Sequence, residues 1–456
     1  MMSQAKTTDL TKGNITPTLL RFAFPMILGN LLQQVYNVAD TLIVGRFIGK
    51  EALAAVGSSY TFMTFLNSIL LGLCMGSGTM ISVYYGKRNR ARMQQGVFLS
   101  FLLIGALTVF LNVAVFLGLD GILAFLQVPS DVYEMMRTYL WIIFWGIGAV
   151  FFYNYFASIQ RAVGNSVVAL LFLGVSSLLN IGLDLLFVLQ FHWGVAGAAA
   201  ATVIAQWFSG IGSAIYTAVR FPEFRVQKEY RRWDSSVAAE LFHLSFLTCV
   251  QQSVMNFGIL MVQGLVNQFG SIIMAAFAVA VKIDSLAYMP VQDFGNAFST
   301  FVAQNHGAKE EARIEKGITS AVRCTLVFCI IISAVVCIFA RPLMLIFVKP
   351  EEVQVVMAGV VYLRVEGAFY CLIGFLFLFY GYFRAMERPA VSVVLTVISL
   401  GTRVGLAYLL SAIPQIGVIG IWAAVPIGWF LADVTGLVLL KKEKKSFSEK
   451  NYQKVQ

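Results

Sequence analysis

Long apolar runs follow one another along the whole chain and are separated by short polar segments. A run of about 20 residues is long enough to cross a bilayer as an α-helix. Stretches such as residues 97–118 lack the alternation of polar and apolar positions that the strands of a membrane β-barrel show. Because backbone polar groups in lipid must bond within their own segment, the pattern predicts an all-α polytopic membrane protein.

The pattern predicts about twelve membrane spans. They run near residues 18–45, 52–84, 95–118, 133–158, 166–190, 195–219, 237–266, 272–305, 317–340, 353–383, 390–411 and 417–440. Several are longer than the roughly 20 residues that a perpendicular helix needs, which indicates tilt or kinks. Pro25 and Pro290, in the first and eighth spans, each remove a backbone donor and are candidates for a fixed bend or a moving hinge.

The second half of the chain repeats the first. Gly49 in FIGKEALAA aligns with Gly270 in QFGSIIMAA, an offset of 221 residues, and the same offset aligns loop 86–92 with loop 307–313. Further along, where GVAG at residue 194 aligns with GVIG at residue 417, the offset is 223. These matches lie in polar loops, so chance similarity between apolar runs explains them poorly. The sequence therefore predicts two pseudo-symmetric six-helix bundles in a parallel repeat, with a substrate pathway expected between them.

The repeat divides the chain into five predicted regions. They are an N-terminal tail (1–17), an N-lobe of helices 1–6 (18–219), an inter-lobe linker (220–236), a C-lobe of helices 7–12 (237–440) and a basic tail (441–456). One set of loops carries most of the Lys and Arg residues, including 87–92, 220–232, 309–316, the loop with Arg384 and Arg388, and 441–445. Positive loops stay on the cytoplasmic side, so we expect both termini and the linker to be cytoplasmic.

Composition agrees with this picture. The chain has 456 residues, of which 59% are hydrophobic and 12% charged, and its mean hydropathy is +0.78. The net charge of +10 lies in short loops, as membrane topology requires, and does not indicate nucleic-acid binding. The six cysteines lie in apolar segments without CxxC spacing, so neither disulfides nor a metal site is expected. Residues 1–17 have no cleavable signal pattern, and we expect the first helix to direct insertion.

Ionisable residues inside spans are functional candidates, because a charge in the membrane interior costs at least a few kcal/mol. Away from the ends of its predicted spans, the N-terminal half has two acids, Asp40 and Asp184. Helical spacing places Gln33 and Tyr36 on the same face as Asp40. It likewise places Ser177 and Asn180 on the same face as Asp184. Thr202 and Gln206 form a similar polar pair on the sixth span. Such a group would supply oxygen ligands for Na⁺, or two close carboxylates would share a proton.

The C-terminal half carries a different set. Asp284, Asp293, Glu366 and Arg403 lie within its spans, and Gln252 and Asn256 lie on the seventh span. The repeat aligns Asn180 with Arg403 and Asp184 with Ala407, so the acids of the halves are not copies of each other. They are candidates for contact with a cationic substrate; alternatively, Arg403 or Lys282 forms an internal ion pair with Glu366 or Asp293.

The two six-helix halves, the FIG-x-x-x-LAA element and the G-x-x-x-x-A-R loops resemble the multidrug and toxic compound extrusion (MATE) family over about residues 15–440. The resemblance implies alternating access between two lobes and export of amphipathic, often cationic compounds by antiport with H⁺ or Na⁺. It also implies a cation site at Asp40, Asn180, Asp184 and Thr202. Some MATE branches use C-lobe acids of the seventh and tenth helices for Na⁺. The one acid of the seventh span is Glu240, close to its start, so the interior of the span has no acid, which argues against that site.

Other functions remain as alternatives. A flippase of lipid-linked or anionic cargo, from the wider superfamily, would need more cationic groups in its interior. An enzyme would need a motif such as HExxH or GxSxG, and the sequence has neither. We therefore expect a transporter without a cofactor, coupled to H⁺ or Na⁺ with H⁺ favoured. We expect it to act as a monomer in a bacterial-type inner membrane.

Overall fold

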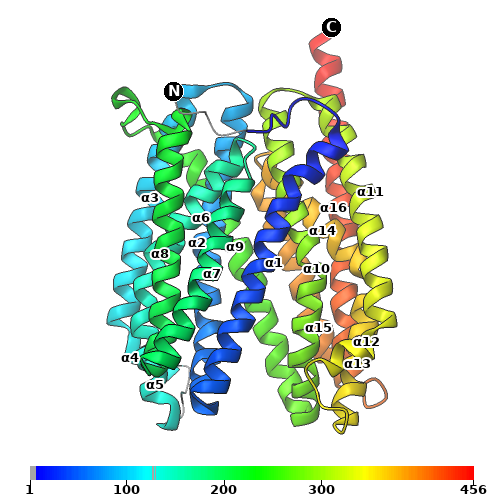
Figure 1. The fold of residues 1–456 in the computed structure, drawn as a ribbon. Helices are drawn as coiled ribbons and strands as arrows, with labels where there is room; N and C mark the ends of the chain where they lie inside the picture. Colours follow the sequence, from blue (N-terminus) through cyan, green and yellow to red (C-terminus); the bar gives the residue numbers. More distant parts are fainter. Residues whose placement is uncertain (1–6, 126–127, 129, 456) are drawn as a thin grey trace. The chain divides into compact units, whose positions relative to one another are not determined.

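The computed structural model describes residues 7–125, 128 and 130–455, and for residues 50, 61, 125, 131, 259–260 and 443–455 it describes the backbone only. All regular elements in these ranges are helical, which confirms the predicted all-α class (Figure 1). Residues 1–6 of the predicted N-terminal tail (1–17) and residue 456 of the predicted basic tail (441–456) lie outside the described residues. Residues 441–455 continue the last helix.

Each half of the sequence contributes a series of long helices joined by short turns. The first half contains α1 (Ile15–Phe47), α2 (Lys50–Gly86), α3 (Arg90–Leu117), α4 (Leu119–Phe125), α5 (Ser130–Ile143), α6 (Ile147–Ala162), α7 (Val167–Asp184) and α8 (Gly194–Arg220). The second contains α9 (Ser235–Val266), α10 (Ser271–Gly307), α11 (Glu311–Ile338), α12 (Ala340–Leu345), α13 (Val353–Gly367), α14 (Tyr370–Ala385), α15 (Pro389–Ser411) and α16 (Val418–Val455).

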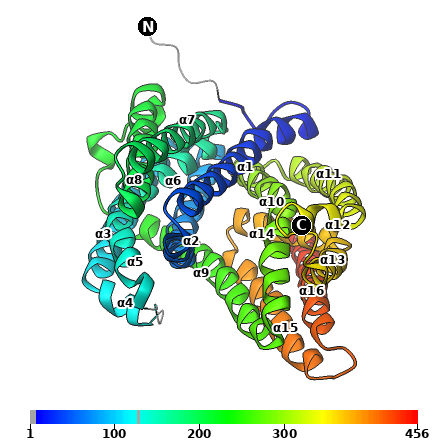
Figure 2. The same ribbon diagram turned by 60° about the horizontal axis from the view of Figure 1, so that its bottom comes forward.

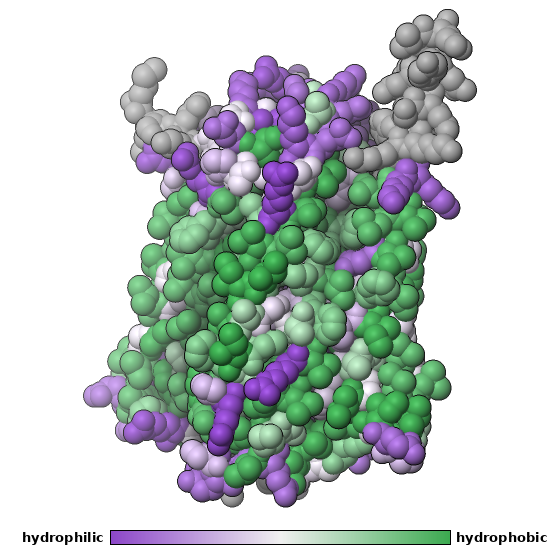
Figure 3. All heavy atoms as spheres, turned by 90° about the vertical axis from the view of Figure 1, so that its right-hand side faces the viewer, coloured by the Kyte–Doolittle hydropathy of each residue, from purple (hydrophilic) through white to green (hydrophobic). Residues whose placement is uncertain are grey.

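The predicted membrane spans are present. Among the described residues, 11 helices or continuous helical segments are long and apolar enough to cross a bilayer, and the pair α13 and α14, bent by 52°, forms a twelfth. The corresponding place in the first half is the 3-10 turn at Phe144–Gly146, between α5 and α6. Helices α1 and α10 run through Pro25 and Pro290. On the face in Figure 3, apolar side chains cover a broad middle zone and polar ones gather at its two ends.

The backbone reproduces the internal repeat. A positive φ angle, which L-residues other than glycine rarely adopt, occurs at matching positions of the two halves. The matching pairs are Gly49 (131°) with Gly270 (90°), Arg88 (54°) with Lys309 (60°), Gly164 (83°) with Glu387 (60°), and Gly194 (57°) with Gly417 (53°). The first two pairs have the offset of 221 and the last two the offset of 223. The turns are therefore repeated even where the residue types differ.

The chain packs as two compact units. Unit 1 comprises the residues up to Ser253 together with Thr300–Ile314, and unit 2 comprises Val254–Ser299 and the residues from Glu315 onward. In unit 1, α2 packs on α3, α5 and α6, and α7 lies between α1 and α8 (Figure 2). In unit 2, α16 packs on α13, α14 and α15. The predicted N-lobe and C-lobe, residues 18–219 and 237–440, stay a prediction as functional domains.

Small residues allow matching helices to cross closely in each unit. In unit 1, an added Cβ at Gly78 on α2 would lie 3.2 Å from Cβ of Ser158 on α6. The repeat aligns Gly78 with Ser299 and Ser158 with Gly381, so glycine and serine have exchanged helices in unit 2. A Cβ added at Gly381 would lie 3.4 Å from Cβ of Ser299. Gly381 is also the tighter site, because its added Cβ would lie 2.5 Å from the backbone oxygen of Gly295.

Gly381→Ala should therefore destabilise the protein, since backbone atoms of α10 and α14 would have to separate. We expect a loss of roughly 1–3 kcal/mol, seen as a lower melting temperature of the purified protein in detergent. Gly401→Ala on α15 is the matched control, because nothing lies within 4 Å of its added Cβ. The control should melt at or above the wild-type temperature. Equal melting of the two variants would contradict this account of the crossing.

Candidate functional site

Helices α1 and α7 bring the two acids of the first half together. Asp40 is half-buried near the end of α1, and Asp184, fully buried, is the last residue of α7. The backbone widens directly after Asp184 into a π-helical turn, Leu185–Gln190. Such turns interrupt the regular helical register and are frequent at functional sites. The carboxyl groups of Asp40 and Asp184 interact directly with each other.

Asn180 and Thr202 complete the four predicted residues, which we call the Asp40–Asp184 cluster. The side-chain amide nitrogen of Asn180, one turn before Asp184, donates to Oγ1 of Thr202 on α8 over 3.3 Å. Asn180 is 2% exposed. The structure thus joins Asp40 to Asp184 through their carboxyl groups and Asn180 to Thr202 through a hydrogen bond, all within unit 1.

The oxygen atoms of this cluster lack donors. Both carboxylate oxygens of Asp184, Oδ1 of Asp40 and the side-chain oxygen of Asn180 are buried and have no hydrogen-bond partner in the described structure. Buried polar atoms are normally paired, and two adjacent carboxylates cannot both ionise without a large electrostatic penalty. A shared proton or a bound monovalent cation would satisfy these atoms, so the cluster has the chemistry of a cation site.

The supporting residues divide into two groups. Tyr36 interacts with Gln33 and lies within electrostatic range of Asp40, as expected from their shared face of α1. Ser177 instead donates to the backbone oxygen of Leu173 over 2.8 Å. The side chain of Gln206 lies against the 3-10 turn between α5 and α6, where a Cβ added at Gly146 would be 2.4 Å from its oxygen.

Tyr139 on α5 is a neighbour of the cluster that the sequence did not single out. It is buried and lies within electrostatic range of both Asp40 and Asp184. A tyrosine in an apolar span is common, so Tyr139 could have been singled out only by knowing that α5 lies near α1 and α7.

No group of three His, Cys, Asp or Glu side chains suited to a metal ion occurs among the described residues. A Na⁺ ion would therefore also need the amide and hydroxyl oxygens.

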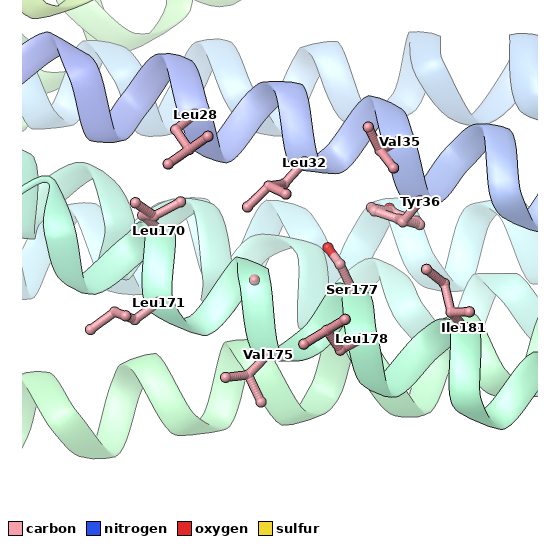
Figure 4. A pocket seen from close by; sticks show the side chains of 11 residues that line it. Leu28, Leu32, Val35, Tyr36, Leu170, Leu171, Val175, Ser177, Leu178 and Ile181 are labelled. Carbon is pink, nitrogen blue, oxygen red and sulfur yellow. The ribbon is translucent and has the colours of Figure 1, made fainter.

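An apolar groove of about 410 Å³ lies between α1 and α7 (Figure 4). Its lining includes Leu28, Leu32, Val35 and Tyr36 from α1, and Leu170, Leu171, Gly174, Val175, Ser177, Leu178 and Ile181 from α7. Tyr36 stands one turn before Asp40, and Ser177 stands one turn before Asn180. The groove therefore borders the Asp40–Asp184 cluster with an almost wholly apolar wall.

Unit 2 has a second buried polar group, the Asp284–Glu366 cluster. Asp284 on α10 and Glu366 on α13 are buried, and both lie within electrostatic range of Arg403 on α15. Tyr370 lies beside Asp284, and Tyr362 beside Glu366. No N–O contact within 4.0 Å joins Arg403 to Asp284 or Glu366 in the described structure, so Arg403 attracts both acids from a longer distance. The alternative of a close ion pair between Arg403 and Glu366 is not seen there.

The other predicted residues of the second half lie apart along their helices. Asp293 is buried on α10, nine residues after Asp284. On α9, Gln252 is buried, with its amide nitrogen 3.6 Å from the sulfur of Met75, and Asn256 is half-buried. Two bases, Lys282 and Arg403, were considered as partners of Glu366. Lys282 is exposed, whereas Glu366 is buried and is attracted by Arg403.

Two buried charged residues were missed or misplaced by the sequence. Asp433 on α16 is 5% exposed, and neither carboxylate oxygen has a partner in the described structure. The rule that identified Asp40 would have found it inside the last apolar run. Arg384, predicted to lie in a basic loop, is instead buried at the end of α14 and donates to Asn296 Oδ1 over 3.0 Å. The loop begins later than hydropathy suggested.

Known proteins match this chain over most of its length. The sequence profile of the MatE family matches residues 25–186 and 245–409. Two relatives from Bacillus subtilis (strain 168) are named as probable multidrug resistance proteins. YpnP is 29% identical over 68% of this chain and 69% of its own length, and YoeA is 25% identical over 91% of each. The crystal structure of a MATE protein in complex with MaL6 superposes with a TM-score of 0.92. It covers 98% of this chain and 100% of its own, at 21% identity, which shows a common fold.

The lack of donors around Asp184 leads to a prediction about stability. Asp184→Asn removes one of two adjacent carboxylates and supplies donors, so it should raise the melting temperature relative to the wild type. The difference should be larger at about pH 8, where both acids tend to ionise, than at about pH 5. Thermal unfolding of both proteins across this range tests it. A difference that does not change with pH would contradict the proposed repulsion between Asp40 and Asp184.

Proposed function

The chain belongs to the MatE family of multidrug and toxic compound extrusion transporters, and on this premise we propose that it exports amphipathic, often cationic compounds by antiport with H⁺ or Na⁺. The relatives are named for multidrug resistance, which places small compounds among the expected substrates. The observation that supports antiport best is the Asp40–Asp184 cluster, because its buried carboxylates require a cation.

In the proposed mechanism, the coupling ion and the cargo favour different states of the transporter. A bound proton or Na⁺ neutralises Asp40 and Asp184, and a cationic compound is favoured when these acids are ionised. A ligand shifts a conformational equilibrium only by its difference in affinity between the two states. If the ion and the cargo do not bind at the same time, ion influx is linked to cargo efflux. In this scheme Asn180 and Thr202 position the acids through their hydrogen bond.

We favour H⁺ as the coupling ion. The two carboxyl groups interact directly, so a single proton between them would relieve their repulsion and supply a donor. A Na⁺ ion would have to collect several more oxygen ligands from the same helices.

Arg403 lies within electrostatic range of two acids, which gives the Asp284–Glu366 cluster no excess positive charge. This observation supports cationic cargo over the pyrophosphate of a lipid-linked flippase substrate, and a substrate contact at Asp284, Asp293, Glu366 or Arg403 stays a prediction.

The remaining assignments belong to the same proposal. The basic loops support a cytoplasmic position for both termini, in a bacterial inner membrane. The transporter would work as a monomer, with the predicted N-lobe and C-lobe alternating between inward- and outward-open states. No step of this scheme requires an organic cofactor.

Ethidium transport into proteoliposomes tests the proposal. An imposed pH gradient and an imposed Na⁺ gradient are applied separately, and ethidium accumulation is followed by fluorescence. We expect one gradient to drive uptake in the wild type. Asp40→Asn and Asp184→Asn should each reduce that uptake by about tenfold or more, because each removes an acid that the coupling ion needs.

Asp120→Asn is the matched control for this assay. Asp120 lies on α4, where its exposed side chain pairs with Arg137 over 2.9 Å, far in sequence from the cluster. It should transport ethidium like the wild type. Gradient-driven uptake that persists in both cluster variants would contradict the coupling role. No uptake under either gradient by folded protein would favour the flippase alternative.

A further inference from the structure

Two arginines occupy the same position of the internal repeat. Arg92 lies in the first turn of α3, and Arg313, 221 residues later, lies in the first turn of α11. Each lies beside the loop with the repeated positive φ angle, at Arg88 and Lys309. Both belong to unit 1, and each contacts the segment that leads into the first helix of the other half of the sequence.

Arg313 holds the segment that precedes α1. Its guanidinium group donates to three backbone oxygens, those of Leu10 (3.2 Å), Lys12 (2.7 Å) and Gly13 (2.7 Å). Asn305 on α10 donates to the Leu10 oxygen as well, over 3.2 Å, and the Leu10 side chain is fully buried. The amide of Thr8 in turn donates to the Gly164 oxygen over 3.1 Å. The N-terminal segment is thereby fixed between parts of both sequence halves.

Arg92 holds the corresponding segment at the start of α9. Its Nη1 donates to Oγ of Ser236 over 2.6 Å and lies 3.6 Å from a carboxylate oxygen of Asp234. The repeat aligns Asp234 with Gly13, so the two arginines contact equivalent places through different chemistry. Hydrogen bonds from Ser236 and Val237 lower the pKa of Asp234 from its ordinary value, which keeps this ion pair charged at neutral pH.

Between the two arginines, the ends of α2 and α10 meet backbone to backbone. An added Cβ at Gly86 would lie 2.0 Å from the Gln304 oxygen, and one at Gly307 would lie 2.1 Å from the Val83 oxygen. The offset of 221 relates Gly86 to Gly307 and Val83 to Gln304. The repeat therefore converts each of the two contacts into the other, and the crossing is pseudo-symmetric in itself. Backbone surfaces without interlocking side chains can separate without repacking a core. The ion pair of Arg92 and two of the three hydrogen bonds of Arg313 are exposed or partly exposed and therefore individually weak, whereas the hydrogen bond of Asn305 is buried.

We propose that Arg92 and Arg313 form a paired clasp that closes the basic-loop ends of the two sequence halves over the Gly86–Gly307 crossing. The clasp rests on the proposed alternating access: it is closed in the present conformation and opens when the path to the basic-loop side opens. The two arginines act together because the pseudo-symmetric crossing can separate only when both of the segments that they hold are released. They are positioning residues that set the conformational equilibrium and do not contact the coupling ion.

Amide hydrogen exchange of the full-length protein in lipid nanodiscs tests the clasp. Arg92→Gln and Arg313→Gln should each speed exchange about threefold or more in the same two segments, residues 83–88 and 304–309, because weakening either contact raises the fraction of molecules in which both held segments are released and the crossing opens. Arg90→Gln is the matched control, since it removes a charge from an exposed position in the same first turn of α3 as Arg92 and should change neither segment. Peptides from α7 and α15 report whether the fold is intact.

The proposal is overturned if each variant affects only its own partner, residues 234–237 for Arg92 and 8–14 for Arg313, or if neither variant changes the crossing. Should a glutamine variant unfold, Arg92→Lys and Arg313→Lys give the same readout, because each keeps the charge but loses the fork of donors. The exchange experiment needs neither ion gradient nor cargo. A transporter that fails to move ethidium but opens at both segments would therefore refute the proposed function and leave the clasp intact.

Discussion

The structure depends on the cost of holding charge inside a membrane. Asp184 is fully buried, interacts with a second carboxyl group on α1 and has no donor for either oxygen. An arrangement of this kind is stable only with a compensating cation, and a protein that needed the cluster merely for packing would be served by neutral groups. A π-helical turn follows Asp184 directly, and one turn before it the hydrogen bond from Asn180 to Thr202 joins α7 to α8. From this constraint follow the proposed coupling and the assignment of the ion to unit 1.

The internal repeat keeps the backbone but not the chemistry. Positive φ angles recur at four matching turns, and the crossing of Gly78 with Ser158 returns as Ser299 with Gly381. By contrast, the position of Asn180 is occupied by Arg403 and that of Asp184 by Ala407. Helix packing therefore constrains small residues and turns in both halves, while the buried charges have diverged. This divergence is the physical basis for different roles of the Asp40–Asp184 and Asp284–Glu366 clusters.

Much of the fold could be predicted from the sequence, because apolar length and loop charge are local properties. The same locality explains why the candidate site could be proposed from the sequence: Asp40 and Asp184 are conspicuous as acids in apolar runs, and Asn180 lies one turn from Asp184. Proximity between helices could not be derived in this way, so Tyr139 was missed. Arg384 was assigned to a loop because hydropathy does not show that its neighbours Asn296 and Ser299 accept its hydrogen bonds. Asp433 was missed although the rule used for the other acids applies to it.

The central claim is that a cation and the cargo compete for the Asp40–Asp184 cluster. The most direct measurement counts the protons, with a pH-indicator dye in weak buffer, and the Na⁺ ions, with a tracer, that purified protein releases when ethidium binds. The account predicts release of about one ion per bound ethidium, with H⁺ favoured, and loss of that release in Asp184→Asn. Ethidium binding that releases neither ion, or release that is unchanged in Asp184→Asn, would contradict it.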